Sequence, residues 1–291
     1  MNQNSYAAPV ELTEVVALLA DNPGSRILAG GQNLLVEPSR RHLLGILLVD
    51  LKKIPGLSGI EAKDEGIRIG AMTTIGAITV SEVVRKACPI LAAAADLVGD
   101  AQVRNRGTLG GAIVESAPGS DLIPVLLVAD AVLEIAGPKL RQVPANEFFA
   151  GGKPAALSPT EVITAVTIPR PAPSTGAAYE KMKDWATLYA LCGVAAAVTL
   201  SRGASSSEGL VTACRVAVTG STEDPVRLKE VEAGLVGLRP DNTSIANAAS
   251  LVDPQLTYRG DAYASAEYRA HLTRVLTRRA LQRAVSAAQQ L

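Results

Sequence analysis

Few residues in this sequence could hold a metal ion. Its 291 residues include three cysteines and two histidines. Cys88, Cys192 and Cys214 lie far apart in apolar surroundings, with no C-x-x-C pair and no histidine close by. We therefore expect buried thiols, and the pattern argues against an iron–sulfur cluster or a zinc site in this chain.

A charge excess and long apolar runs are also missing. The sequence has 28 basic and 28 acidic side chains, so its formal net charge is +0 and it lacks the basic footprint of a nucleic-acid-binding protein. Apolar stretches such as 124–131 and 194–200 are far shorter than the ~20 residues that span a bilayer. The polar start at 1–5 has no signal-peptide core, so we expect a cytoplasmic protein.

Hydropathy patterns and turn residues divide the chain into three segments. Residues 1–57 predict a small strand–helix–strand unit, because apolar positions at helical spacing are followed by two short apolar runs. Residues 58–172 predict short strands alternating with helices. Proline and glycine crowd into 170–176, which predicts a linker. Residues 177–291 predict two strands around a Ser/Gly hairpin at 203–209, with helices after them.

The middle segment changes its pattern several times. A turn at 64–66 between apolar runs predicts a hairpin, and a helix over 81–98 is expected to break near Pro89. The stretch 99–111 is rich in glycine and arginine, and we expect a loop there. A short helix over 121–129 and strands at 131–136 and 162–168 complete the prediction for this segment.

The first candidate binding site is the stretch Ala29-Gly30-Gly31-Gln32-Asn33-Leu34, which follows an expected strand at 26–28. Consecutive glycines can adopt positive φ and let backbone N–H groups converge on an anion such as a diphosphate. A tight strand-to-helix turn is the commoner explanation of a Gly-Gly pair alone. The stretch also matches neither the dinucleotide fingerprint nor the P-loop.

The second candidate is the stretch 101–111, which holds three glycines, Thr108 and two arginines. Asp121 follows ten residues later, where it could accept a hydrogen bond from a ribose hydroxyl. A structural ion pair or a solvated loop would explain Arg104 and Arg106 equally well. Two such stretches in one chain favour a dinucleotide ligand.

Four motifs occur in a fixed order along nearly the whole chain. They are AGGQNLL at 29–35, IGAMTTI at 69–75, QVRNRGTLGG at 102–111, and SAEYR at 265–269 with RRAL at 278–281. Each motif alone is only suggestive. Together they resemble the FAD-binding medium subunits of the xanthine dehydrogenase and carbon monoxide dehydrogenase family, the molybdenum hydroxylases.

The resemblance implies an α+β fold. Two α/β subdomains, 1–57 and 58–172, would form the vanillyl-alcohol-oxidase-type FAD-binding fold, and a C-terminal α+β domain at 177–291 would cover the flavin. The FAD is expected to be non-covalent, because neither His42 nor His271 lies in a matched flavin motif.

The resemblance also implies roles for individual residues. Ala29–Asn33 and Thr108–Ala112 would hold the diphosphate through backbone N–H groups, and Asp121 would bind the ribitol or ribose side. The segment 73–75 would run near the isoalloxazine ring, Lys181 would make a polar contact with it and Tyr189 would shield it, although Tyr189 could instead be a core aromatic. The full set of expected FAD-binding residues is Ala29, Gly30, Gly31, Gln32, Asn33, Leu34, Thr73, Thr74, Ile75, Ala101, Val103, Thr108, Gly110, Gly111, Ala112, Asp121, Lys181 and Tyr189.

The sequence departs from the family pattern at two places. Ala112 stands where members often carry Asn, Asp or Ser, so one side-chain contact to the cofactor would be missing. Glu115-Ser116-Ala117-Pro118 replaces a more usual His-Ala-Asp-Pro stretch, which weakens any transfer of roles to these positions.

The function implied by the resemblance is an electron relay. An iron–sulfur small subunit and a molybdopterin large subunit would complete a heterotrimer that can dimerise, and FAD in this chain would pass electrons to NAD, quinone or oxygen. Two alternatives stay open: a stand-alone FAD-dependent oxidase or dehydrogenase of a small organic substrate, which lacks an obvious base, and a non-catalytic flavin-binding module. The primary substrate would be chosen in another chain.

Overall fold

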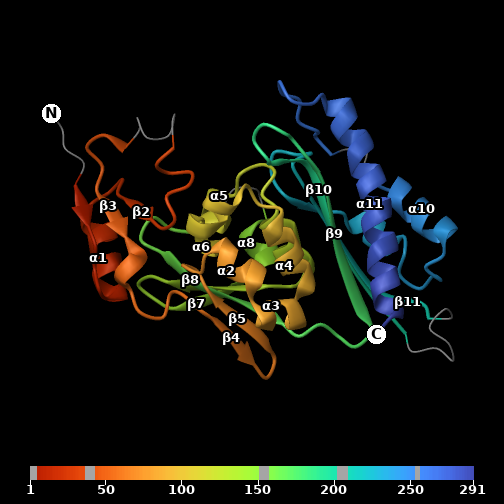
Figure 1. Cartoon of the computed structure of the whole chain (residues 1–291), viewed down its shortest axis with the longest axis horizontal. Coiled ribbons are helices and arrows are strands. Elements are labelled where there is room, and N and C mark those ends of the chain that lie inside the picture. Colours follow the sequence, from red (N-terminus) through yellow and green to blue (C-terminus); the bar gives the residue numbers. More distant parts are fainter. Residues whose placement is uncertain (1–4, 37–42, 151–156, 202–208, 253–255) are drawn as a thin grey trace.

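The chain folds into three sheets with helices packed between and around them (Figure 1). The computed structural model describes residues 5–36, 43–150, 157–201, 209–252 and 256–291. The sheets follow the order of the sequence, from a small unit near the N-terminus to a long curved sheet beside the C-terminal helix. All three cysteines are buried free thiols, as expected from their apolar neighbours.

The first sheet is a parallel α/β unit. Its strands lie in the order β1-β3-β2, and helix α1 contributes Val15 and Leu19 to a small core with Val49 of β3. The strand–helix–strand pattern predicted for this segment is therefore confirmed. The elements are β1 (Tyr6–Ala7), α1 (Leu12–Asp21), β2 (Arg26–Leu28), β3 (Leu48–Asp50) and the 3-10 turn η2 (Leu51–Lys53).

The second sheet has five antiparallel strands in the order β4-β5-β8-β6-β7. Its alternation is that of a sheet with one covered face: Ile67 and Ile69 are buried among the helices, whereas Arg68 pairs with Glu134 of β6 at 2.8 Å on the other face. The predicted hairpin is confirmed as β4–β5. The strands are β4 (Ile60–Lys63), β5 (Gly66–Gly70), β6 (Val132–Ala136), β7 (Arg141–Pro144) and β8 (Val162–Pro169).

In the described residues, seven short helices form the layer that packs with this sheet, and α3, α6 and α8 contact its strands directly. Pro89 begins one of them, so the predicted helix over 81–98 does break there. The prediction of a loop at 99–111 is wrong, because two helices form and the side chains of Asp100 and Thr108 cap their first turns. The helices are α2 (Ile75–Val80), α3 (Glu82–Ala87), α4 (Pro89–Asp96), α5 (Ala101–Arg106), α6 (Leu109–Glu115), α7 (Leu122–Val128) and α8 (Ala145–Phe148).

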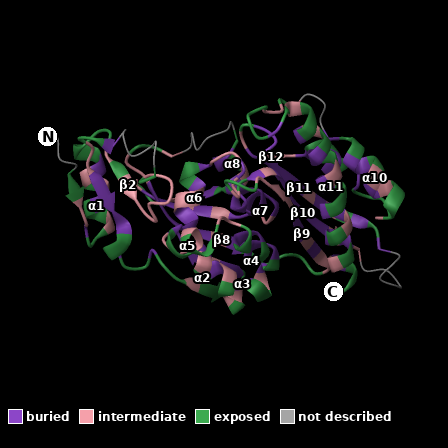
Figure 2. Ribbon diagram, turned by 45° about the horizontal axis from the view of Figure 1, so that its top comes forward, coloured by how far each residue is buried: buried purple, intermediate pink, exposed green. Residues whose placement is uncertain are grey.

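The third sheet is antiparallel, in the order β12-β11-β10-β9. The long helix α11 packs on β9 and β10, while Tyr179, Ala195 and Ala217 of the sheet join the core of the middle helices. Figure 2 shows the completely buried α7 between this sheet and the rest of the middle unit. The elements are β9 (Thr175–Lys183), β10 (Ala190–Leu200), β11 (Val211–Thr219), β12 (Val226–Arg227), α9 (Lys229–Ala233), α10 (Asn242–Ser250) and α11 (Ala266–Gln289).

The third sheet also corrects part of the sequence prediction. β9 begins at Thr175, inside the predicted linker, and continues through a stretch for which no strand was predicted. The two predicted strands are present as β10 and β11, but most of the hairpin expected at 203–209 lies outside the described residues.

The SAEYR motif has a structural role at the start of α11. Ser265 caps the helix, and the buried Arg269 donates to the carbonyl oxygens of Leu191 at 2.6 Å and Gly220 at 2.7 Å. Arg269 also pairs with Asp261 at 2.7 Å. The motif therefore fastens the helix to the ends of β10 and β11. No helix in the described ranges is long and apolar enough to cross a membrane.

We predict that Gly176→Ala destabilises the chain by about 1–3 kcal/mol, the usual cost of overpacking. A Cβ at Gly176 would overlap the Ala284 carbonyl and the Ala288 amide of α11. Gly260→Ala is the matched control, since its Cβ would meet nothing closer than 3.5 Å. Urea denaturation measures both variants, and equal midpoints would contradict the tight contact between β9 and α11.

Candidate functional site

Two of the sequence motifs lie side by side through backbone contacts. Thr74 and Thr108 form an isolated antiparallel bridge. The Ile75 amide donates to the Gly107 carbonyl at 2.8 Å, and the Leu109 amide donates to the Thr73 carbonyl at 3.0 Å. The segments 73–75 and 108–111, far apart in the sequence, therefore form one wall of a site.

The first glycine-rich stretch packs directly against this wall. A Cβ at Gly30 would overlap the Arg106 carbonyl and would lie 2.9 Å from the Gly107 Cα, so no larger residue fits. Of the glycine pair, only Gly31 adopts positive φ, at 73°. Gly30 is thus required for close backbone approach, and Gly31 supplies the left-handed conformation, so each glycine has one of the two properties for which glycine is suited.

A pocket of about 1130 Å³ opens where the first sheet, the middle helices and the β9–β10 turn meet. Small-molecule sites usually span roughly 300–1,000 Å³, so a dinucleotide-sized ligand suits this volume. Most of the expected FAD-binding residues line it: Ala29, Gly30, Gly31, Gln32, Asn33, Leu34, Ile75, Val103, Thr108, Gly110, Gly111, Ala112, Asp121 and Tyr189.

Four residues from the expected set lie outside the pocket lining. Thr73 is buried and exchanges hydrogen bonds with the Gly59 backbone, while Thr74 caps α2. Ala101 is exposed in the first turn of α5. Lys181 lies behind Asp121 and contacts it directly.

Several pocket residues were not expected from the sequence, among them one residue and one segment that no motif suggested. Arg26 of β2 lines the pocket, as does the segment 157–163 at the start of β8. The pattern at 162–168 indicated only a buried strand, and an arginine on a short strand carries no site signal of its own.

The arginines of the second stretch do not line the pocket. Arg104 donates to the carbonyl oxygens of Val98 and Gly99, each at 3.1 Å, and lies 3.7 Å from Asp96. The structural interpretation of Arg104 is therefore the correct one. The guanidinium groups of this stretch are therefore not placed to bind an anion in the pocket.

The amides around the pocket fall into two groups. Those of Leu109 and Gly110 donate to backbone carbonyls across the wall, and those of Gly111 and Ala112 donate to Thr108. Within the described part of the chain, the amides of 30–34 have no protein acceptor. Among the described residues, the first stretch therefore offers a run of amides without a protein acceptor beside the pocket, whereas the amides of 109–112 are already paired.

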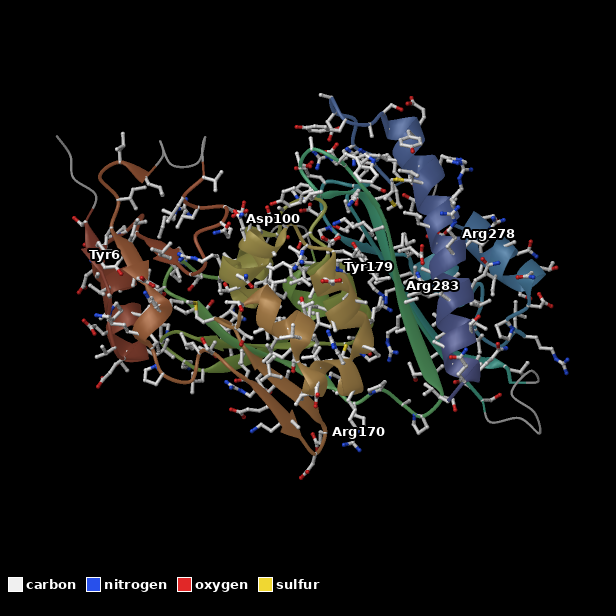
Figure 3. All side chains as sticks on the ribbon, in the orientation of Figure 1. Tyr6, Asp100, Arg170, Tyr179, Arg278 and Arg283 are labelled. Atoms are coloured by element: carbon white, nitrogen blue, oxygen red, sulfur yellow. The ribbon has the colours of Figure 1, made fainter. Side chains whose placement is uncertain are left out.

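A buried cluster of three polar side chains lies beside the pocket. Asp121 accepts hydrogen bonds from the Tyr179 hydroxyl at 2.7 Å and the Lys181 ammonium at 2.7 Å. Tyr179, labelled in Figure 3, lies on β9 at its boundary with the middle helices. Burial raises the pKa of the Asp121 carboxyl from 3.8 to about 6, although both partners act in the opposite direction.

Tyr189 closes the pocket on the side of the third sheet. Its ring lines the pocket at the start of β10, and its hydroxyl donates to Asn33 Oδ1 at 3.4 Å. The side chain is 40% exposed, so it is not a core aromatic. Burial, followed by the nearby charge of Glu115, raises the pKa of the Tyr189 hydroxyl.

Comparison with known proteins gives matches over nearly the entire chain. The family model for the FAD binding domain in molybdopterin dehydrogenase matches residues 2–171, and that for the CO dehydrogenase flavoprotein C-terminal domain matches residues 177–284. The carbon monoxide dehydrogenase medium chain of Afipia carboxidovorans is 33% identical, with 96% of each chain covered. The xanthine dehydrogenase FAD-binding subunit of Escherichia coli O157:H7 is 30% identical, covering 98% of this chain and 97% of that one.

A solved structure gives the same result in three dimensions. A chain of the carbon monoxide dehydrogenase from Hydrogenophaga pseudoflava superposes with a TM-score of 0.91 at 33% identity, with 98% of each chain covered. The mixed arrangement of helices and sheets is therefore shared with a protein of known structure.

We predict that Asp121 makes the stability of the chain depend on pH with a defined sign. Because its pKa is raised, the carboxyl stabilises the fold fully below about pH 4, and this contribution is lost as the pH rises through about 6. Relative to Asp121→Asn, whose side chain cannot titrate, the wild type should lose stability as the pH rises from about 4 to about 7, because the pKa of this carboxyl is higher in the folded chain than in the unfolded one. Urea denaturation across this range tests it, and a constant difference would contradict the raised pKa.

Proposed function

This chain belongs to the family of FAD-binding medium subunits of the molybdenum hydroxylases, and we propose how its pocket holds the flavin and where the electrons go. It is an oxidoreductase subunit that binds FAD non-covalently. Its partners are an iron–sulfur small subunit and a molybdopterin large subunit, from which this flavin takes electrons. The flavin then reduces an external acceptor, for which NAD, quinone and oxygen are the candidates.

The diphosphate of FAD binds at the first glycine-rich stretch. The amides of 30–34 support this placement, because a dianion needs several converging donors and these amides have no acceptor among the described residues. Thr108 adds its hydroxyl hydrogen, since its Oγ1 already accepts from the Gly111 amide. The segment 110–112 then serves mainly as a close, smooth wall along which the cofactor lies.

The isoalloxazine ring occupies the end of the pocket near Asp121 and Tyr189. Both residues line that end, and Tyr189 bridges toward Asn33 of the first stretch, which makes it a lid over the ring. Ile75 contributes apolar surface. Thr73, Thr74, Ala101 and Lys181 support the walls from behind.

The domain organisation follows from the same placement. We assign 1–57 and 58–172 to two halves of a vanillyl-alcohol-oxidase-type FAD-binding fold, and 177–291 to a C-terminal domain over the flavin. Three separate sheets that meet at one pocket support this division. We also place the complex in the cytoplasm, since its free buried thiols suit a reducing compartment.

We expect Gly30→Ala to weaken FAD binding at least tenfold, or ~1.4 kcal/mol, because the new methyl group pushes the two stretches apart. Flavin absorbance per complex and FAD titration of the cofactor-free complex measure the effect. Gly260→Ala is the control and should retain wild-type affinity. Equal affinity of both variants would contradict this placement of the diphosphate.

Removing FAD from the complete complex tests the electron relay. Substrate oxidation with an artificial dye that accepts electrons from the partner subunits should persist, whereas reduction of the natural acceptor should be lost and should return with added FAD. Turnover of a small organic donor by this chain alone would instead favour the stand-alone oxidase. A wild-type complex that takes up no FAD would favour the non-catalytic module.

A further inference from the structure

The ammonium group of Lys181 has no donor left for a cofactor. Its Nζ lies 2.7 Å from Asp121 Oδ2, 2.8 Å from the Leu188 carbonyl and 2.9 Å from the Leu97 carbonyl. An ammonium has three N–H donors, so these acceptors use all of them. The side chain is only 3% exposed and does not line the pocket, so a direct contact with the flavin ring does not fit this geometry.

The three acceptors belong to three different parts of the fold. Leu97 ends α4, Asp121 precedes α7, and Leu188 lies in the turn between β9 and β10. Lys181 itself comes from β9. Its ammonium therefore ties the β9–β10 turn of the third sheet to two helices of the middle unit.

One of the three hydrogen bonds of Lys181 is made to the residue that precedes Tyr189. Leu188 precedes Tyr189 and adopts a φ of 61°, a conformation that costs energy for a side chain other than glycine. Hydrogen bonds within the turn, from the Leu188 amide to Asp184 and from the Asp184 amide to Tyr189, hold its shape. The bond from Lys181 to the Leu188 carbonyl anchors that turn to the pocket wall.

We propose that Lys181 is a positioning residue, which locks the turn 184–189 over the flavin pocket and so sets how far Tyr189 restricts access to the ring. The proposal rests on the proposed placement of FAD. In this proposal Lys181 does not contact the flavin ring. By holding Leu188, and through it Tyr189, it slows the release of FAD and limits the access of small oxidants to the flavin.

The chemistry of the cluster explains why a lysine is suited to this position. A buried ammonium must be paired and fully hydrogen-bonded, and Asp121 supplies the opposite charge while two carbonyls supply the remaining acceptors. The Tyr179 hydroxyl donates to the other carboxylate oxygen of Asp121, so both oxygens of Asp121 and all three N–H groups of Lys181 are hydrogen-bonded. Glutamine could reproduce only part of this set, and methionine none of it.

The test compares Lys181→Met with Lys183→Met in the complete complex. Lys183 lies two residues along the same strand, and its ammonium rests 4.5 Å from the centre of the exposed Trp185 ring, so it contacts the same turn through none of the three acceptors of Lys181. In Lys181→Met we expect about tenfold faster FAD release after dilution and about tenfold faster reoxidation of reduced flavin by dioxygen. Each rate change corresponds to an activation free energy lower by ~1.4 kcal/mol. Lys183→Met should behave as wild type.

A double-mutant cycle with Tyr189→Ala separates positioning from a general loss of structure. If Lys181 acts through Tyr189, Lys181→Met should change the reoxidation rate little in a chain that already carries Tyr189→Ala. If Lys181→Met does not fold, Lys181→Gln, which keeps two N–H donors, replaces it in the same cycle.

Two results would overturn the proposal: equal rates for the Lys181 and Lys183 variants, or fully additive effects of the Lys181 and Tyr189 substitutions. Either result with wild-type FAD content leaves the proposed function intact. A wild-type complex that binds no FAD would instead remove the proposed function itself.

Discussion

The site depends on a steric constraint, the contact between the backbone at Gly30 and the backbone at 106–107. No side chain fits between them, so the parallel sheet and the middle helices can approach closely enough to form a continuous pocket wall. The bridge between Thr74 and Thr108 then fixes the other side of that wall. A few ångströms of separation at Gly30 would leave the free amides of 30–34 without the opposing surface that makes them a binding site.

Largely buried cations fasten the third sheet to the helices that pack against it. Lys181 and Arg269 each donate to two backbone carbonyls and pair with one aspartate, and Arg227 joins Glu232 to the Leu127 carbonyl at the end of α7. A buried charge is costly without partners, so each cation stabilises only the arrangement in which all its acceptors are in place. These groups specify how the sheet sits on the helices more than they strengthen the fold.

Sequence patterns were sufficient where local chemistry decides the structure. The turn between β4 and β5 and the helix break at Pro89 were predicted because turn residues and proline are local signals, whereas the expectation that the two glycine motifs share one site rested on the family resemblance. β9 was missed, since its sequence TGAAYEKMK mixes small and charged residues that become buried only against α11 and the middle helices. The stretch 99–111 was misjudged because its glycines suggest a loop, whereas capping by Asp100 and Thr108 favours helices.

The structure also changes what the two glycine-rich stretches mean. As sequences they look equivalent, each able to present amides to a phosphate. In the structure Gly107 and Gly110 let the second stretch pack closely against Ile75 and Ala71, and the amides of 109–112 are already paired. Under the proposed placement of the diphosphate, Ala112 is less of a defect than the sequence suggests, because its helix would act as a wall and the amides across the pocket would bind the charge. The same reasoning applies to Lys181, whose identity is explained by the carbonyls it holds. In this protein only some of the residues that match a flavin motif would touch the flavin. The others have their polar groups already hydrogen-bonded within the protein, and this is what separates the two kinds of residue.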